Sequence, residues 1–569
     1  MKVFFTYINI ILAIALLPKP AEAQQWDGLT LYSNMGSTAG YLIDTASTVV
    51  KQWTFTGNTG YSTHMMPGGN IVRSVANMGN VLTGGGITGR LQKIDYNGNI
   101  LWDWTYSSST YVIHHDHCVL PNGNILVISY DVKTAADVAA AGGTLNSVVW
   151  SEKIMEIEPV GTNQVNVVWE WKLWDHLVQN VDANKANYQS SIVNNPQLMN
   201  INYALQKDWM HMNGVDYNPA LNQIVFSSHN LNSWFVIDHS TTTAEAAGHT
   251  GGHAGKGGDF LFRWGNPASY QASGTKIFDV THDAHWIPED CPNGGNLSGI
   301  NNRGQTSPSI RTTADQVIIP RVGLNYTLTP GSAYTPSTYS ARKVGTGYTT
   351  NMGNVQEFPN GNHMMCLATV GSIIELDAAG NVLWSKSTSG TTPQAHRYSL
   401  CYINNVVPAQ PTISVANASV FTCTQADTYQ WYLNGTAVSG ATLQTYTATT
   451  AGYYTVRITQ TPSCEDRFAS AVQYTVEAPP PVDLTGIATV SLLAETSLYP
   501  NPTNNILNIV VPASIENYTV KIFSQTGDLL IAEKNVASVE LGTLADGLYI
   551  VNISAEAGQS INKKITVLK

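Results

Sequence analysis

The amino-acid sequence predicts an all-β protein, with a β-propeller in its N-terminal part and two smaller β-domains after it. Charged residues make up only 12% of the 569 residues, whereas Gly, Asn, Thr, Tyr and Trp are frequent, and this composition favours turns and strands over solvated helices. Short hairpins recur at a spacing of roughly 40 to 60 residues, as they do in propellers and related β-arrays. Helical periodicity is weak along the whole chain.

Residues 1–23 are expected to be a secretory signal peptide. Lys2 supplies a positive start, an apolar run follows from Val3 to Leu17, and Ala-Glu-Ala ending at Ala23 fits a small-x-small cleavage site. No later stretch is apolar enough to span a bilayer. The formal net charge of -11, without basic clusters, argues against nucleic acid as a partner. We therefore expect an exported protein without a transmembrane segment.

Residues 24–406 are expected to form the propeller, because two kinds of hairpin alternate there. One kind turns at Asp-x-x-Gly-Asn, as in Gly89–Trp104 and Gly371–Lys386, and its second strand carries a Trp. The other turns at Pro-Asn-Gly-Asn, starting at Pro121 and Pro359, and Asn-Gly suits a tight turn with positive φ. The repeats indicate five or six blades. The segment Trp174–Leu198 is the best candidate for a helical insertion.

Residues 407–478 have the short-strand pattern of an Ig-like β-sandwich. Trp431 is expected to be its buried core residue, and "TAGYYTV" around Tyr454 resembles a tyrosine corner. Cys423 and Cys464 flank this unit and are expected to pair. Two other pairings, Cys366 with Cys401 and Cys118 with Cys291, stay open, because spacing cannot decide connectivity. A Pro-rich linker, residues 479–490, follows.

Residues 491–569 resemble the C-terminal sorting domain of proteins exported by the type IX secretion system. The resemblance lies in Tyr499-Pro500-Asn501-Pro502, in Gly547-Leu548-Tyr549, in Gly527 and in the pair Lys563 and Lys564. It implies a small β-sandwich and a Bacteroidetes-type Gram-negative exporter. It also implies the type IX machinery as partner, a secreted or outer-membrane-surface location with possible cell-surface attachment, and removal of this domain after export.

The most informative residues are histidines that recur at one phase of the hairpin repeat. His115 lies six positions before Pro121, and His282 lies six positions before Pro288, in a shared pattern His-Asp-x-x-x-[Leu/Ile]-Pro. His211 opens a third hairpin just before its turn. Because the innermost strands of a propeller line its channel, these histidines are expected to meet near one mouth. The aspartates that follow His115 and His282 are expected to point away, as strand alternation demands.

Histidines in such a cluster point to nucleophilic chemistry rather than to a metal. A transition-metal site usually needs further fixed ligands, so no metal is expected. Imidazole attacks sulfuryl and phosphoryl centres, and neighbouring cationic His or Arg side chains stabilise the charge that develops.

The propeller is similar to the bacterial arylsulfotransferase family over nearly all of residues 26–406. The matching motifs are "HHDHCVLPNGNIL", "DWMHMNGVDYNPALNQIVFSS", "FRWGNP", "THDAHWIPE", "NVQEFPNGNHMMC" and "QAHRYSLCY". The resemblance implies a six-bladed propeller that moves a sulfuryl group from a phenolic sulfate ester to a phenol through a sulfated histidine. It implies no nucleotide sulfate donor and no cofactor.

The resemblance also assigns roles to residues. His282 takes the place of the nucleophile, and His211 and His115 take those of the supporting catalytic histidines, with His114 beside them as a substrate contact. The family's Arg falls on His229, a departure that matters because Arg is always charged and His is not. Three further substrate-binding candidates could compensate for it: Arg397, His396 and Arg263.

Two other functions remain open from the sequence. The first is a non-catalytic surface propeller that binds glycans or small aromatic or anionic ligands. The second is a quinoprotein-like propeller, suggested by the Trp-bearing blades. That function would need a quinone and a divalent metal, and the chain has neither a Cys-Cys pair nor an obvious acidic metal cluster.

Overall fold

The computed structural model describes residues 24–569 except 77–78, 418, 464, 476–491 and 556–558. The expected signal peptide and the expected linker therefore lie outside the described residues. The chain divides into two compact units, residues 1–476 and 477–569. No helix in the described ranges is long and apolar enough to serve as a membrane span.

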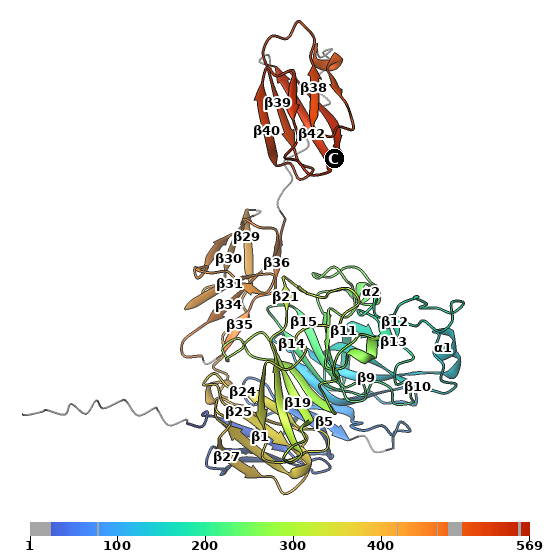
Figure 1. The fold of residues 1–569 in the computed structure, drawn as a ribbon. Helices are drawn as coiled ribbons and strands as arrows, with labels where there is room; N and C mark the ends of the chain where they lie inside the picture. Colours follow the sequence, from blue (N-terminus) through green and yellow to red (C-terminus); the bar gives the residue numbers. More distant parts are fainter. Residues whose placement is uncertain (1–23, 77–78, 418, 464, 476–491, 556–558) are drawn as a thin grey trace, which may run out of the picture. The chain divides into compact units, whose positions relative to one another are not determined.

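The all-β fold class is confirmed (Figure 1). The α-helices in the described residues are short: α1 (Ala135–Ala140), α2 (Thr243–Ala246) and α3 (Leu400–Ile403). Single 3-10 turns lie at Leu173–Asp175, Pro267–Tyr270, Ala368–Val370 and Leu492–Glu495.

The described residues between 29 and 398 form six four-stranded antiparallel sheets. Five of them are built from strands that are consecutive or nearly so along the chain. They are β4 (Thr59–Met65), β5 (Ile71–Ala76), β6 (Gly89–Ile94) and β7 (Ile100–Thr105); β8 (Tyr111–Val119), β9 (Ile125–Lys133), β10 (Val149–Val160) and β11 (Gln164–Lys172); β14 (Met212–Asn218), β15 (Gln223–Ser228), β16 (Ser233–Asp238) and β17 (Phe262–Trp264); β18 (Thr281–Trp286), β19 (Leu297–Gln305), β20 (Arg311–Val317) and β23 (Ala341–Val344); and β24 (Asn354–Glu357), β25 (His363–Leu367), β26 (Ser372–Leu376) and β27 (Val382–Ser387).

The sixth sheet joins the two ends of this region. Its strands are β1 (Leu29–Ser33), β2 (Ala39–Ile43), β3 (Val49–Thr54) and the late strand β28 (Ala395–Tyr398), which pairs with β1. One edge strand of each sheet contacts an edge strand of the next sheet; in the sixth sheet this strand is β28. The contacting pairs are β4 with β8, β8 with β14, β14 with β18, β18 with β24, β24 with β28, and β28 with β4. The innermost strands therefore form a closed ring.

Turn chemistry explains why the hairpins form where the sequence predicts them. In the Asp95 turn, the aspartate accepts the Asn99 backbone N–H at 2.8 Å, and Gly98 adopts φ +97°. The Asp377 turn repeats this arrangement with Asn381, again at 2.8 Å.

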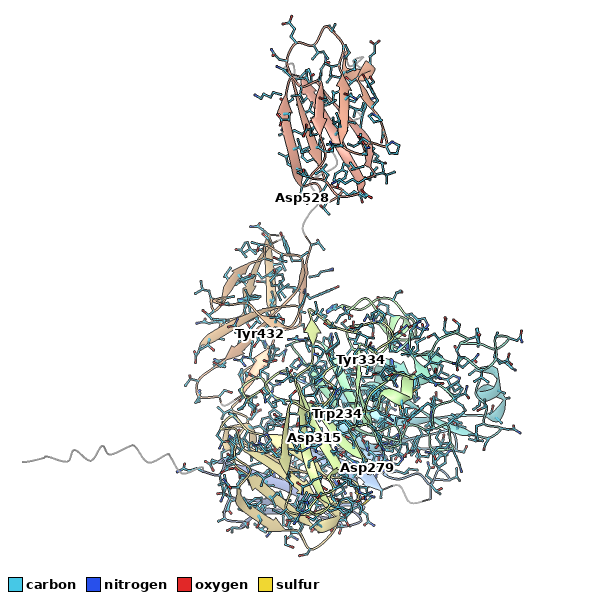
Figure 2. The ribbon with its side chains drawn as sticks, in the orientation of Figure 1. Trp234, Asp279, Asp315, Tyr334, Tyr432 and Asp528 are labelled. Carbon is cyan, nitrogen blue, oxygen red and sulfur yellow. The ribbon has the colours of Figure 1, made fainter. Side chains whose placement is uncertain are left out.

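Tryptophans connect neighbouring sheets. The Trp53 indole donates to the Tyr96 carbonyl at 2.9 Å, and Trp102 donates to the Gln164 carbonyl at 2.8 Å. Inside the unit, the fully buried Trp234 donates to Thr281 Oγ1 at 2.8 Å (Figure 2). Each such indole buries a large apolar surface and satisfies its polar N–H at the same time.

The predicted helix at Trp174–Leu198 is wrong. This segment holds the strand β12 (Leu177–Val178), which pairs in parallel with β13 (Met199–Asn200), and turns lie between them. Polar side chains capture its backbone: Gln179 Oε1 accepts from the N–H groups of Val181 and Asp182, and Asp182 Oδ1 accepts from that of Asn184. Such local hydrogen bonds compete with helix formation.

A second two-stranded sheet, β21 (Arg321–Val322) and β22 (Asn325–Tyr326), lies in the same region of the chain.

Residues 408–475 pack as two sheets around Trp431, which is fully buried as predicted. The strands are β29 (Ile413–Asn417), β30 (Val420–Cys423) and β33 (Thr445–Thr447) in one sheet, and β31 (Thr428–Leu433), β32 (Thr436–Ala437), β34 (Gly452–Thr459), β35 (Asp466–Phe468) and β36 (Val472–Tyr474) in the other. The Tyr454 hydroxyl donates to the Thr450 carbonyl at 2.8 Å, the hydrogen bond of a tyrosine corner.

The disulfide expectations need correction. Cys423 is a free thiol buried in the sandwich core, so the predicted pair with Cys464, which lies outside the described residues, is wrong. Cys366 is free as well, and its thiol donates to the Thr392 carbonyl at 3.2 Å, whereas Cys401 is disulfide-bonded. Cys118 and Cys291 are also free.

The second unit contains two antiparallel sheets around its own core. Their strands are β37 (Ser497–Tyr499), β38 (Ile506–Val510) and β41 (Ser538–Glu540), and β39 (Tyr518–Phe523), β40 (Leu529–Lys534), β42 (Gly547–Ala555) and β43 (Ser560–Val567).

Candidate active site

Five histidines from three neighbouring sheets form one continuous group, here called the first histidine cluster: His114, His115, His211, His229 and His282. Ring centroids are 4.7 Å apart for His115 and His211, 5.0 Å for His211 and His229, and 5.6 Å for His229 and His282. The structure thus brings together the histidines that the sequence places in separate hairpins.

Irregular backbone positions these side chains. The strands β8, β14 and β18 each contain a register shift where the histidines lie. His115 and His211 have φ of +52° and +53°, values that non-glycine residues rarely adopt and that concentrate at functional sites. Asp283 also has φ +58°, and both Asp116 and Asp283 line a separate cavity whose lining includes neither His115 nor His282.

Asn302 determines the tautomer of His282. The Asn302 amide nitrogen donates to the carbonyls of Thr349 (3.1 Å) and Met352 (2.9 Å), so its oxygen faces His282 Nδ1 at 2.7 Å. His282 Nδ1 must therefore carry the proton, which leaves the lone pair on Nε2. That nitrogen accepts the Met352 backbone N–H at 3.1 Å.

His282 is also held neutral. Its side chain is only 2% exposed, and burial, with the neighbouring His229, holds its pKa well below the usual value of 6.5. A neutral imidazole with a directed lone pair is the form of histidine that acts as a nucleophile.

His211 is oriented by a carboxylate. Asp208 Oδ2 lies 2.7 Å from His211 Nδ1, and the Tyr130 hydroxyl donates to the other Asp208 oxygen at 3.0 Å. Burial acts to raise the pKa of Asp208, but the hydrogen bond and charge of His211 and the hydrogen bond from Tyr130 together outweigh it, and the pKa falls below its usual value. The ionised Asp208 can therefore stabilise a protonated His211, as in a His-Asp pair that transfers protons.

His115 is the last member of a hydrogen-bonded chain that runs from Glu152 through His114. Burial raises the pKa of Glu152 well above its usual value and lowers that of His114 to about 3, so both groups are neutral. A neutral Glu152 donates its proton to His114 Nε2 at 2.9 Å, and His114 Nδ1–H donates to His115 Nδ1 at 2.8 Å. The proton of neutral His115 then lies on Nε2.

His229 stands where the family resemblance expects Arg, and it supplies no permanent charge. Its Nδ1 lies 2.8 Å from Asn230 Oδ1, and burial, with the nearby His211, lowers its pKa below 6.5. At neutral pH His229 is therefore an uncharged imidazole in place of a fixed guanidinium.

The two predicted arginines lie elsewhere. Arg263 is fully buried and donates to the Leu198 carbonyl (3.1 Å) and to Ser269 Oγ (2.8 Å). Arg397 is paired with buried Glu375 and donates to Thr30 Oγ1 at 2.9 Å. Both guanidinium groups thus serve packing within the sheets.

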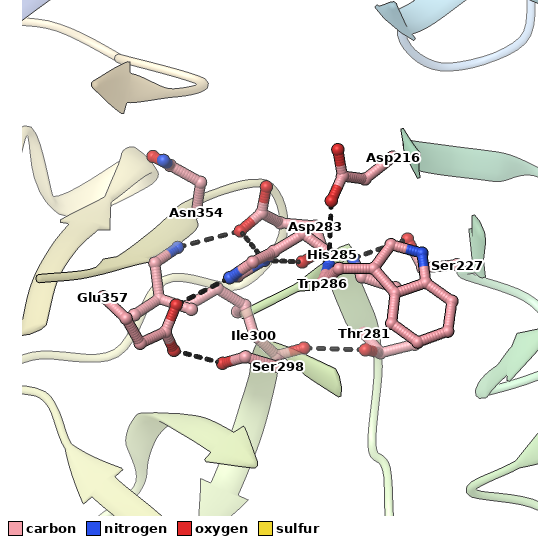
Figure 3. Close-up of polar contacts among 12 residues, drawn as sticks. Asp216, Ser227, Thr281, Asp283, His285, Trp286, Ser298, Ile300, Asn354 and Glu357 are labelled. Carbon is pink, nitrogen blue, oxygen red and sulfur yellow. Dashed lines mark hydrogen bonds and ion pairs between the residues drawn. The ribbon is translucent and has the colours of Figure 1, made fainter. Parts of the chain in front are cut away.

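His396 belongs to a different group, called here the second histidine cluster: His64, His117, His285 and His396. These side chains line a cavity of about 260 Å³ together with carboxylates. Figure 3 shows His285 between Glu357 and Asp283, with contacts of 2.8 Å and 3.3 Å. Burial opposes protonation of His285, but these carboxylates outweigh it and hold its pKa well above 6.5. The sequence analysis did not place His64, His117 and His285 in a site.

A glycine loop covers the first histidine cluster. A side chain at Gly86 (φ +65°) would place its Cβ 2.3 Å from His115 Nε2, and one at Gly85 would lie 2.9 Å from His211 Cε1. The Gly86 carbonyl also accepts the His115 backbone N–H at 2.7 Å. Only glycine allows the backbone of residues 84–86 to approach the imidazoles this closely.

Sequence reasoning missed Asp208, Glu152, Asn302 and Met352. Asp208 stands three residues before His211, inside a motif that the sequence analysis used, so its spacing was a readable signal. The other three reach the cluster from separate strands and loops, and no local pattern marks them.

Comparison with known proteins adds the family context. A family model described as arylsulfotransferase matches residues 17–396, and a secretion-system C-terminal sorting domain matches residues 497–568. Among curated proteins, none matches the chain. The chain is similar to a protein of unknown function from Bacteroides caccae, with 11% identity over 65% of this chain and 98% of that one and a TM-score of 0.37. It is also similar to the periplasmic gluconolactonase of Pseudomonas aeruginosa, with 12% identity over 66% and 99% and a TM-score of 0.33.

Proposed function

The chain belongs to the arylsulfotransferase family, and on that premise we propose that it transfers a sulfuryl group from a phenolic sulfate ester to a phenol through a sulfated His282. The observation that supports this most directly is the state of His282. Asn302 holds the proton on Nδ1, and burial keeps the ring neutral, so Nε2 has the lone pair that attack on sulfur requires.

In the first half-reaction, His282 Nε2 attacks the sulfur of the donor. A bond forms between Nε2 and sulfur as the bond between sulfur and the aryl oxygen breaks. Protonated His211, stabilised by Asp208, gives its proton to the departing phenolate. The Met352 N–H, which contacts Nε2 before the donor binds, lies close enough to donate to a sulfuryl oxygen on that nitrogen.

In the second half-reaction, neutral His211 takes the proton of the acceptor phenol. The phenolate oxygen attacks sulfur, and the bond between sulfur and His282 Nε2 breaks. His115 Nε2–H donates to a sulfuryl oxygen in both steps, and neutral His229 adds no positive charge. The two half-reactions restore His282 and His211, and no nucleotide or other cofactor takes part.

The test is turnover of a chromogenic aryl sulfate with a phenol acceptor. His282→Ala should lower kcat by on the order of 10⁶-fold, as removal of a nucleophile does in other covalent enzymes. His249→Ala is a matched control, because the His249 side chain is 58% exposed and lies outside the cluster. Near-normal turnover by His282→Ala would exclude His282 as the nucleophile.

One observation favours a second function, a propeller that binds aryl sulfates without turnover. His229 is neutral where the family resemblance expects a permanent positive charge. Stoichiometric binding of an aryl sulfate by the unaltered protein, without product under any acceptor, would support this function instead.

A further inference from the structure

The second histidine cluster shares two innermost strands, β8 and β18, with the first. His117 follows His115 by two residues on β8, and His285 follows His282 by three on β18. Its cavity is lined by several carboxylates, among them Asp116 and Glu357. Imidazole nitrogens beside carboxylates suit a cation rather than a sulfate ester.

His117 lines this cavity, and one of its ring nitrogens has no hydrogen-bond partner in the described residues. The Ser62 hydroxyl donates to the His115 carbonyl at 3.2 Å, so Ser62 Oγ accepts from His117 Nδ1–H at 2.8 Å. The lone pair therefore lies on Nε2, which is buried and has no hydrogen-bond partner among the described residues. His117 is only 1% exposed.

Three further side chains stand close to His117. His396 Nε2 is likewise buried without a hydrogen-bond partner in the described part of the chain, and its ring centroid lies 4.6 Å from that of His64. His64 Nε2 lies 3.1 Å from Asp116 Oδ1. One ligand atom from each of His64, Asp116 and His117 can be chosen so that all three lie within 4.8 Å of one another.

We propose that His64, Asp116, His117 and His396 bind one divalent transition-metal ion of the zinc class. Three imidazole nitrogens and one carboxylate oxygen are a ligand set that zinc accepts in tetrahedral geometry. Ligand atoms of such a site lie about 3.4 Å apart, so His64, Asp116 and His117 close by about an ångström as the ion binds, and His396, which lies outside that close group, moves further. The hydrogen bond from His117 Nδ1 to Ser62 is the outer-shell contact that orients a metal-bound histidine.

The other group with metal-like spacing is a weaker candidate. His176, His249 and Asp259 also lie close together. However, His176 Nδ1 lies 2.9 Å from Asp259 and its Nε2 lies 2.8 Å from the Ala246 carbonyl, so both of its nitrogens are already hydrogen-bonded.

The proposed ion joins the ends of the ring. Its ligands come from the innermost strands of three sheets: β4, β8 and the late strand β28, which completes the sheet of β1. An ion that binds only the folded ring stabilises it by mass action. The proposal is independent of sulfuryl transfer.

Metal content of the full-length protein tests the proposal. The protein is stripped with EDTA, loaded with Zn²⁺ and dialysed against zinc-free buffer. It should then retain one ion per chain. The Tm of the stripped protein should rise when zinc is added. His64→Gln and His396→Gln should each weaken binding at least tenfold, whereas the matched control His249→Gln should bind like the unaltered protein. Circular dichroism verifies that each variant is folded.

A readout on the unaltered chain covers the case in which a variant does not fold. Co²⁺ in place of Zn²⁺ should give the intense visible absorption of a four-coordinate nitrogen and oxygen site. Absence of a stoichiometric ion in the unaltered protein would overturn the proposal. Loss of the ion in His249→Gln, with retention in His64→Gln and His396→Gln, would also overturn it and assign the ion to the other group.

Discussion

At the scale of single residues, Asn302 decides which nitrogen of His282 can react. Its amide donates to two carbonyls and so offers only its oxygen to Nδ1. Asn302→Ala removes this control and lets the ring adopt either tautomer. We expect kcat to fall on the order of 10²-fold, with a smaller change in donor KM, because catalysis depends on the correct tautomer.

A turn residue provides the control for this experiment. Asn97→Ala changes the same residue type at an exposed hairpin turn and should leave kcat unchanged. Steady-state kinetics with both variants decide the matter. If Asn302→Ala keeps the kcat of the unaltered protein, the tautomer of His282 does not depend on Asn302.

His229 is the second residue whose chemistry can be tested directly. Burial and His211 keep it uncharged at neutral pH, so it binds an anionic donor weakly. His229→Arg introduces a permanent charge and two parallel donors for sulfuryl oxygens. The donor KM should fall about tenfold at pH 7.5, and the gain should shrink at pH 5.5, where His229 itself gains protons. An unchanged or higher KM at both values would show that His229 does not contact the donor.

At the scale of elements, the loop of residues 84–86 presses on the reacting groups. Gly86→Ala places a Cβ 2.3 Å from His115 Nε2 and also strains a backbone at φ +65°. Either the loop or the imidazole must move, so we expect kcat to fall at least tenfold, since small misplacements of catalytic groups are costly. The measurement is turnover together with thermal denaturation.

Gly79→Ala separates the clash from the backbone strain. Gly79 lies in the same connection and has φ +108°, but nothing lies within 4 Å of its added Cβ. It should lower stability by about 1 kcal/mol without loss of turnover. Equal turnover losses in Gly79→Ala and Gly86→Ala would point to backbone strain rather than contact with His115.

Elements with local causes were predictable from the sequence. The Asp-x-x-Gly-Asn hairpins, buried Trp431 and the Tyr454 corner follow from residues a few positions apart. The equal positions of His115 and His282 in their hairpin repeats correctly predicted a shared cluster, because equivalent positions in repeated sheets lie close together around the ring. The helix expected at Trp174–Leu198 is wrong because Gln179 and Asp182 hydrogen-bond the backbone.

The supporting residues could not be predicted in the same way. Asn302 and Met352 reach His282 from β19 and from the loop before β24, and Glu152 reaches His114 from β10. These contacts depend on how sheets pack, which no short motif records. The missing Arg, by contrast, was visible in the sequence, and the structure adds that neither Arg263 nor Arg397 replaces it.

At the scale of the whole molecule, buried histidines make stability depend on pH. Burial lowers the pKa of His117 from 6.5 to about 3, so the unfolded chain binds a proton between these values and the folded chain does not. The contribution of neutral His117 to the free energy of unfolding is fully present above pH 6.5 and is lost as the pH falls toward 3. His114 and Glu152 nearly cancel between pH 4.5 and 6.5, because their neutral pair holds one proton in both states.

Urea denaturation at several pH values measures this effect, with EDTA present to exclude metal binding. Between pH 6 and 4, the free energy of unfolding of the unaltered protein should fall more steeply than that of His117→Gln. The difference should be about 1.4 kcal/mol per pH unit, the value for one proton. Identical slopes would mean that His117 titrates normally in the folded protein.

The C-terminal sorting domain indicates where the whole protein is located. Its presence at residues 497–568 indicates a secreted or cell-surface protein. The family domain and the sorting domain fall in different compact units of the chain, so chemistry and export depend on separate cores. A sulfuryl transfer that needs no nucleotide donor is compatible with such a location.

The central claim is that His282 carries the sulfuryl group. Peptide mass spectrometry of the full-length protein, incubated with an aryl sulfate and without acceptor, tests it most directly. We predict an increase by the mass of one SO₃ group on the peptide that contains His282, and its loss after addition of a phenol. Turnover without any adduct on His282, or an adduct on another residue that phenol discharges, would contradict the account.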